Sequence, residues 1–179
     1  KWGLERDVKF LATGGYVESV AALEKRRVHA AVLDPPRAYI ARKKFGFKEL
    51  ANLGQEFKYA TTVIVARESQ LRKDRETYIQ FAKAVIEGTH RVKTDREFAI
   101  KTLSQMLRST DREILEETYR VFSALYEKVP YPAVEGIQPI LDEIALQNPK
   151  AKNYKPDDFI DTTIVKQLEQ AGFVESVYR

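Results

Sequence analysis

Residues 28–47, VHAAVLDPPRAYIARKKFGF, pass abruptly from an apolar run to an acid and two consecutive prolines. The run is apolar apart from His29, as expected for a strand that is covered on both faces. Proline has no main-chain N–H, so the prolines end the strand. Pro36 can then occupy the first position of a helix that Gly46 closes. The pattern predicts a buried strand that stops at Asp34 and leaves a carboxylate at the junction.

A second strand-like segment comes earlier in the chain. Residues 7–12, DVKFLA, have the β-branched and aromatic content of a short strand, and TGG at residues 13–15 ends it. Residues 16–27 have helical spacing, and the basic residues 25–27 fall in the last turn, where cations suit the helix dipole. Strand, helix and strand in tight succession predict a parallel βαβ unit with a right-handed crossover. Residues 60–68, ATTVIVARE, are a third strand candidate.

Helical patterns replace strand patterns from about Asp74 onward. The tetrapeptide TDRE occurs at residues 94–97 and 110–113, and each copy is a capping box that predicts a helix start at the threonine. A last helix, capped by Asp161, is expected to stop at Gly172. The predicted fold class is therefore α/β: a parallel-type sheet with a βαβ unit, followed by a helix-rich C-terminal half.

Composition narrows the class of protein. The 179 residues are 44% hydrophobic and 31% charged, which is typical of a globular chain, and no run of about 18 apolar residues encodes a membrane span. The absence of cysteine excludes disulfides, thiolate catalysis and cysteine-ligated zinc. The net charge of +4 is modest, and the basic residues alternate with acids. A solvated mixed-charge surface is favoured over a nucleic-acid interface.

Catalytic and metal-binding patterns are weak. The chain has no G-x-S-x-G elbow and no cysteine nucleophile. His29 is interpreted as a satisfied core imidazole and His90 as a cation near a helix end. Asp157, Asp158 and Asp161 are interpreted as residues of a helix cap, because no metal-ligand spacing accompanies them. We predict no enzyme activity, no metal and no cofactor.

The two predicted strand–helix junctions are the candidate ligand site. Ligands of parallel α/β sheets bind outside the carboxyl ends of the strands, so both junctions would open on one edge. The TGG turn could expose helix N-terminal amides to an anion or polar group, or could be only a tight turn, and the sequence favours neither. Asp34 could cap the following helix and still present an oxygen to a ligand. The predicted ligand-binding residues are Thr13, Gly14, Gly15, Asp34 and Pro35.

The succession DVKFLATGG…VAALEKRRVHAAVLDPP…ARKKFGFKELANL…TTVIVARES resembles periplasmic substrate-binding proteins of ABC transporters. It is most similar to the class for nitrate, sulfonate, taurine and thiamine-precursor-like solutes. RETYIQFAKAVIEG, YPAVEGIQPILDE and DDFIDTTIVKQLEQAGF resemble the C-terminal helices of that class. The chain departs from the family pattern where His29 replaces the usual acid and where Arg27 takes the common glycine position.

The resemblance implies the C-terminal portion of a type II periplasmic binding fold. Residues 1–59 would belong to the second α/β lobe, residues 60–73 to a hinge-proximal strand and crossover, and residues 74–179 to helices that pack on a first lobe. That first lobe has no counterpart in this chain. It would come from further sequence or from a partner chain.

The resemblance also implies a function without turnover. Two lobes would close on a small polar or anionic solute, such as a sulfonate, nitrate, taurine or a pyrimidine, and deliver it to an ABC permease. The expected location is periplasmic or extracytoplasmic. Half of the closing contacts would be missing from this chain, so we expect it to bind solute weakly by itself. The alternatives are a ligand-sensing module of a regulator or receptor, and a thiamine-precursor-type enzyme that would need His29 as its base.

Overall fold

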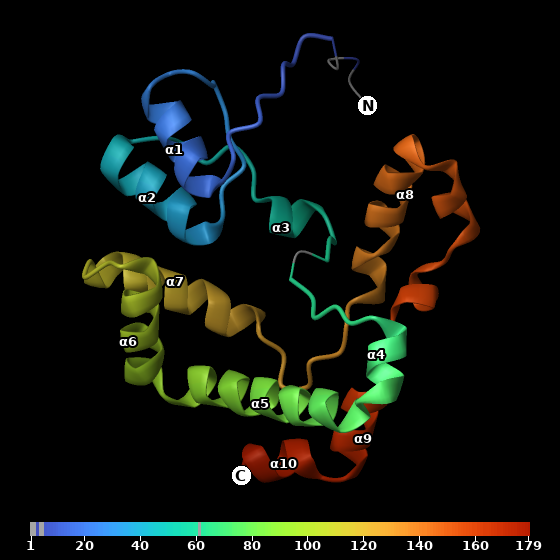
Figure 1. Ribbon diagram of the computed structural model, residues 1–179. Helices are drawn as coiled ribbons and strands as arrows, with labels where there is room; N and C mark the ends of the chain where they lie inside the picture. Colours follow the sequence, from blue (N-terminus) through green and yellow to red (C-terminus); the bar gives the residue numbers. More distant parts are fainter. Residues whose placement is uncertain (1–2, 4–5, 61) are drawn as a thin grey trace. The chain divides into compact units, whose positions relative to one another are not determined.

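The computed structural model describes residues 3, 6–60 and 62–179, and this part of the chain is 64% helical (Figure 1). Thr61, in the predicted third strand, and residues 1–2 and 4–5 of the predicted lobe lie outside the described residues. The α-helices in chain order are α1 Tyr16–Glu24, α2 Pro35–Phe45, α3 Leu53–Glu56, α4 Glu68–Lys73, α5 Arg75–Thr94, α6 Arg96–Leu107, α7 Arg112–Leu125, α8 Gln138–Gln147, α9 Thr163–Gln170 and α10 Phe173–Val177. The 3₁₀ helices are η1 Val134–Gly136, η2 Pro149–Asn153 and η3 Pro156–Phe159.

The prediction of an α/β fold with a parallel-type sheet is wrong, because residues 3, 6–60 and 62–179 contain no strand. A strand needs main-chain hydrogen bonds to a neighbour about 4.8 Å away, and none joins the described parts of the three apolar segments. The first segment precedes α1, and the other two come before α2 and α4. Side chains in them are open to solvent: Phe10 is 94% exposed and Val65 is 84% exposed. The residue types favoured strands, but they could not supply the pairing partner.

The chain divides into two compact units. Of the three borders between them, one lies between α2 and α3, and the other two fall inside α6 and α7. Unit 1 comprises Lys1–Leu50 and Leu103–Val121; unit 2 comprises Ala51–Thr102 and Phe122–Arg179. Within unit 1, α1 packs against α2. The buried residues of unit 1 are apolar or small: Ser19, Ala22, Leu23, Pro36, Ala41, Ile114, Leu115 and Thr118.

Helices α5, α9 and α10 build the core of unit 2. Ile79 and Ile86 lie seven residues apart on one face of α5, and they cluster with Leu168 of α9 and Val174 of α10. Ile86 and Val174 are completely buried. The cluster is closed by partly buried side chains: Ala82, Val129, Ile164, Phe173, Val177 and Tyr178. This packing holds the C-terminal helices on α5.

Aspartates, not threonines, cap the helices that follow the two TDRE copies. Thr94 is the last residue of α5, and the Asp95 carboxylate accepts a hydrogen bond of 3.0 Å from the Phe98 amide at the start of α6. Asp111 likewise accepts from the amides of Glu113 and Ile114 at the start of α7. The motif therefore predicts that a helix starts near each copy, but each helix starts one residue later than predicted. Asp fills the N-cap position in place of Thr, since either residue can do so.

A lysine side chain and two glycines stabilise or terminate the C-terminal ends of helices. The Lys93 ammonium of α5 donates to the carbonyls of Ser123 and Tyr126, at 2.9 and 2.7 Å, and so satisfies main-chain acceptors at the C-terminal end of α7. Gly46, with φ of 70°, ends α2, and Gly172, with φ of 71°, lies between α9 and α10. Both glycine stops confirm the sequence prediction.

Gly136 marks a close approach of two main-chain segments within unit 2. The Ala60 amide donates to the Gly136 carbonyl at 3.1 Å. A Cβ atom at Gly136 would lie 2.7 Å from the Ala60 nitrogen and 3.1 Å from the Tyr59 carbonyl carbon. Only glycine fits there without moving backbone, and backbone moves less readily than a side chain.

We therefore expect Gly136→Ala to destabilise unit 2 by roughly 1–3 kcal/mol, the usual cost of overpacking. Gly88, inside α5, is the matched control, because a Cβ atom there meets nothing within 4 Å. Gly88→Ala should leave stability unchanged or raise it by up to about 1 kcal/mol, since alanine is the better helix former. Urea unfolding of both variants measures the difference. A loss of stability in Gly136→Ala that is no greater than that in Gly88→Ala would contradict the close approach at Gly136.

Candidate functional site

The first predicted junction forms a hydrogen-bonded turn at the start of α1. The Thr13 and Ser19 hydroxyls lie 2.7 Å apart, and Ser19 donates to the Gly15 carbonyl at 2.8 Å. Ser19 is buried, with 8% of its surface exposed. Gly14 has φ of 99°, a conformation that other residues rarely adopt, so the turn requires glycine at this position.

The Glu18 carboxylate lies beside this turn. A Cβ atom placed on Gly15 would be 2.6 Å from the Glu18 Oε2 atom. Glu18 belongs to the first turn of α1, where a negative charge complements the helix dipole. An anionic solute that approaches these amides therefore competes with a carboxylate of the protein itself.

The second predicted junction is the start of α2. The Asp34 Oδ1 atom accepts from the Arg37 amide at 3.2 Å, which confirms Asp34 as the helix cap. Its Oδ2 atom accepts from the Arg37 guanidinium at 2.8 Å. The Asp34 and Arg37 side chains are 21% and 30% exposed. Pro35 occupies the first position of α2, where the missing N–H is not needed.

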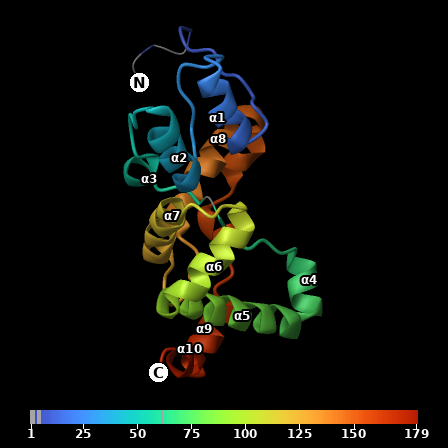
Figure 2. The same cartoon turned by 90° about the vertical axis from the view of Figure 1, so that its left-hand side faces the viewer.

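Both junctions lie at the same end of the α1–α2 pair. The two helices run side by side in the same direction, because the non-helical segment 28–33 returns the chain alongside α1 before α2 begins (Figures 1 and 2). Six extended residues reach about 20 Å, which exceeds the length of about 14 Å of a nine-residue helix. Within the described part of the chain, no hydrogen bond or ion pair joins Thr13, Gly14 or Gly15 to Asp34.

Sequence reasoning missed three residues at this end. Ser19 lies four residues after Gly15, Glu18 lies in the first turn of α1, and Arg37 lies three residues after Asp34. One helical turn brings each of them back to the residue that it contacts. This spacing was the available signal, and it places two charges of opposite sign among groups that were predicted to contact solute.

His29 belongs to unit 1, whereas His90 and the acidic residues near the C-terminus belong to unit 2. The prediction that His29 is a core residue is wrong, because it is exposed in the segment before α2. His90 lies in α5, and its ring meets that of Tyr178 edge-on at 4.7 Å. Asp161 accepts from the Thr163 amide at 2.7 Å and acts as a helix cap, as predicted. Among the residues that the structure describes, no group of three or more His, Asp or Glu side chains could hold a metal ion.

An acid–base cluster fastens α2 to the α6–α7 turn within unit 1. The Glu113 carboxylate accepts from both the Tyr39 hydroxyl and the Lys43 ammonium, and Lys43 also lies 3.5 Å from Asp111. The hydrogen bond from Lys43 lowers the pKa of Glu113 and raises the pKa of Lys43. The Ile114 amide is the largest cause of the lowered pKa of Asp111.

These pKa shifts predict how pH affects α2. A carboxylate whose pKa is lowered by folding stabilises the fold above its unfolded pKa, here 3.8 for Asp111 and 4.5 for Glu113, and this stability is lost as pH falls through the folded pKa. The Lys43 contribution is lost only as pH rises above 10.5. The cluster should therefore hold α2 at neutral pH and release it in acid.

We expect Lys43→Met to speed amide hydrogen exchange in α2 at neutral pH, and to have a smaller effect at about pH 3, where the carboxylates begin to be protonated. Lys44→Met is the control, because Lys44 is exposed beside Lys43 and makes no ion pair. Hydrogen exchange is compared with that of the unmodified protein at each pH, to correct for intrinsic rates. A difference of the same size in acid as at neutral pH, or one that Lys44→Met reproduces, would contradict the role of the cluster.

No described helix is both long and apolar enough to cross a membrane. Comparison of the chain with models of known protein families, with curated proteins and with solved structures finds no match.

Proposed function

We propose that this chain is the solute-binding component, or part of it, of an ABC importer that captures a small polar or anionic solute for a permease outside the cytoplasm. The sequence resemblance led to this proposal, although the α/β fold that it implied is wrong. One observation carries the proposal: α1 and α2 begin at the same end of unit 1, with Thr13, Gly14 and Gly15 at one start and Asp34 and Pro35 at the other.

The charges at this end favour a solute that carries both an acidic and an amino group. Main-chain amides at a helix start suit a sulfonate or carboxylate, and the Asp34 carboxylate suits an ammonium. Arg37 can turn from Asp34 to the acidic group of the solute, since its side chain is 30% exposed. A short amino-sulfonate such as taurine combines both groups, whereas an alkanesulfonate lacks the amine.

Exposed apolar side chains support the proposal that further polypeptide completes the binding protein. Phe10, Val32, Ile64 and Val65 are each more than 60% exposed on segments without helix. Phe10 and Val32 belong to unit 1 and Ile64 and Val65 to unit 2, so each unit exposes apolar side chains that another chain or lobe could cover. This chain alone then provides part of the binding contacts, and we expect it to bind the solute weakly.

Weak binding is measured best by shifts of amide resonances in NMR spectra during titration with taurine. We expect the shifted amides to lie in residues 13–19 and 34–37. Asp34→Ala should abolish the shifts, whereas Asp161→Ala should preserve them, although each substitution removes a carboxylate that caps a helix. Equal loss in both variants, or no shifts at either helix start with taurine, nitrate or a pyrimidine, would exclude this solute site.

Substitution of Glu18 tests the competition at the start of α1. Glu18→Gln removes the carboxylate beside Gly15, so we expect it to strengthen binding of an alkanesulfonate several-fold. Glu24→Gln, at the other end of the same helix, removes the same charge and should have no effect. The same NMR titration gives both dissociation constants. Equal gains would mean that net charge alone governs binding.

A further inference from the structure

The net charge of the protein resides in unit 1. Unit 2 has 16 basic and 16 acidic residues, whereas unit 1 has 14 basic and 10 acidic residues, which accounts for the whole excess of +4. The asymmetry is sharper between residues 25 and 48, where eight basic residues meet a single acid, Asp34. Mixed charge in the sequence as a whole hides this local concentration.

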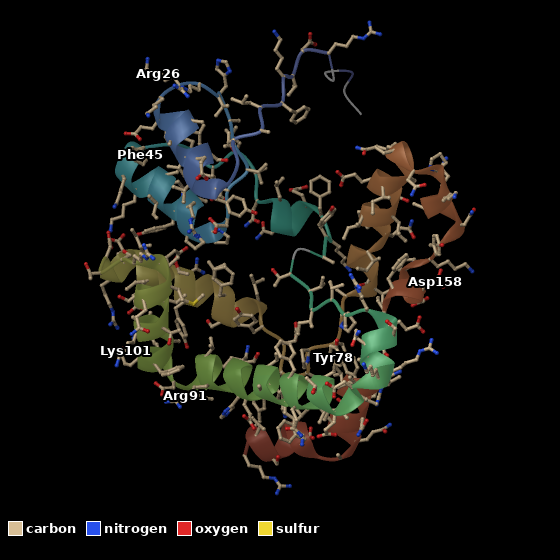
Figure 3. The ribbon with its side chains drawn as sticks, in the orientation of Figure 1. Arg26, Phe45, Tyr78, Arg91, Lys101 and Asp158 are labelled. Atoms are coloured by element: carbon tan, nitrogen blue, oxygen red, sulfur yellow. The ribbon has the colours of Figure 1, made fainter. Side chains whose placement is uncertain are left out.

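The parallel arrangement of α1 and α2 brings their C-terminal ends together, and basic residues gather there. We define the basic end as Lys25, Arg26, Arg27, Lys44 and Lys48, which follow α1 or belong to the end of α2 and the segment after it. Figure 3 labels Arg26 and Phe45, which lie near these two helix ends. The end therefore collects cations from two separate stretches of sequence.

The cations of the basic end have no ionic partner among the described residues. All five are exposed, and none takes part in an ion pair. Two neighbouring cations do: Arg42 pairs with Glu49, and Lys43 pairs with Glu113 and Asp111. Even when these acids and Glu24 are counted against all seven basic residues, three positive charges remain in excess.

We propose that the basic end docks on the surface of a bilayer that contains anionic phospholipid. Its positive charges are spread over two helix ends, which suits a diffuse negative surface more than a single bound anion. Phe45, which is 39% exposed and stands beside the Phe47 ring, adds an aromatic side chain of the kind that enters the headgroup region. A nucleic acid would be favoured by several aromatic rings interleaved with unpaired cations. Phe45 and Phe47 stand beside the basic end, whereas the Tyr39 ring meets Arg42 and Lys43, which already pair with acids.

The test measures sedimentation of the protein with vesicles of phosphatidylglycerol and phosphatidylcholine, and with vesicles of phosphatidylcholine alone. We expect binding only to the anionic vesicles, and a steep loss of binding as salt rises above about 0.1 M, where the Debye length falls below about 10 Å. Failure to bind anionic vesicles at low salt overturns the proposal. So does equal binding to both kinds of vesicle.

Two variants with the same net charge locate the surface. K25Q/R27Q/K44Q/K48Q removes four cations from the basic end, and K150Q/K152Q/K155Q/K166Q removes four exposed lysines from unit 2. Each basic residue contributes roughly fivefold to the partition coefficient, so the first variant should bind at least about tenfold more weakly. The second should bind nearly as well as the unmodified protein. Equal losses would show that net charge, not this surface, drives binding.

A milder variant and a competitor complete the test. R27Q/K48Q changes only residues outside helices, so it keeps the fold and should still weaken vesicle binding several-fold. Circular dichroism confirms that each variant is folded. Single-stranded DNA that displaces the protein from vesicles at equal charge concentration would assign the surface to nucleic acid instead and overturn the proposal. None of these outcomes depends on solute binding, so they are independent of the proposed transport function.

Discussion

Each helix must satisfy main-chain groups at its ends without help from a sheet, and the rest of this structure depends on how charged side chains meet that need. Asp34, Asp95, Asp111 and Asp161 accept amide hydrogen bonds where helices begin. Lys93 donates to carbonyls where α7 ends. The described part of the chain has small buried clusters, so these caps fix where each helix starts and how the connecting segments leave it.

Capping also limits what the candidate site can do. Both carboxylate oxygens of Asp34 already accept hydrogen bonds from Arg37, so a bound ammonium would have to share or replace one of them. The hydroxyls of Thr13 and Ser19 satisfy one another and the Gly15 carbonyl, which keeps the first turn closed. A solute can be recognised at this end only if it provides better partners than Arg37 and Glu18 do. That requirement favours a zwitterion over a simple anion such as nitrate.

Local interactions were predictable from the sequence, and non-local ones were not. The cap at Asp34 and the glycine stop at Gly46 each depend on residues within a few turns of one another. The prediction of a sheet was wrong because pairing requires a second strand. The β-branched residues 63–65 do not indicate where in the chain that strand would be. The prediction that His29 is buried was wrong for the same reason, because its strand had no partner to cover it. In the candidate site, the two turns were predictable, whereas the roles of Glu18 and Arg37 required knowledge of which helices actually form.

Because the chain returns through residues 28–33, α1 and α2 point in the same direction, and the two ends of this helix pair differ in charge. Because α1 and α2 run in the same direction, their partial positive amide ends meet at one end and their carbonyl ends at the other. Cations at the carbonyl ends offset the helix dipoles, yet Lys43 and Arg42 already pair with acids there, so the remaining cations exceed what the local acids neutralise. An excess that local pairing leaves open is available to a partner. Since the helices separate the two ends by about 14 Å, more than a Debye length at physiological salt, an anionic surface at the basic end would scarcely disturb a solute at the other.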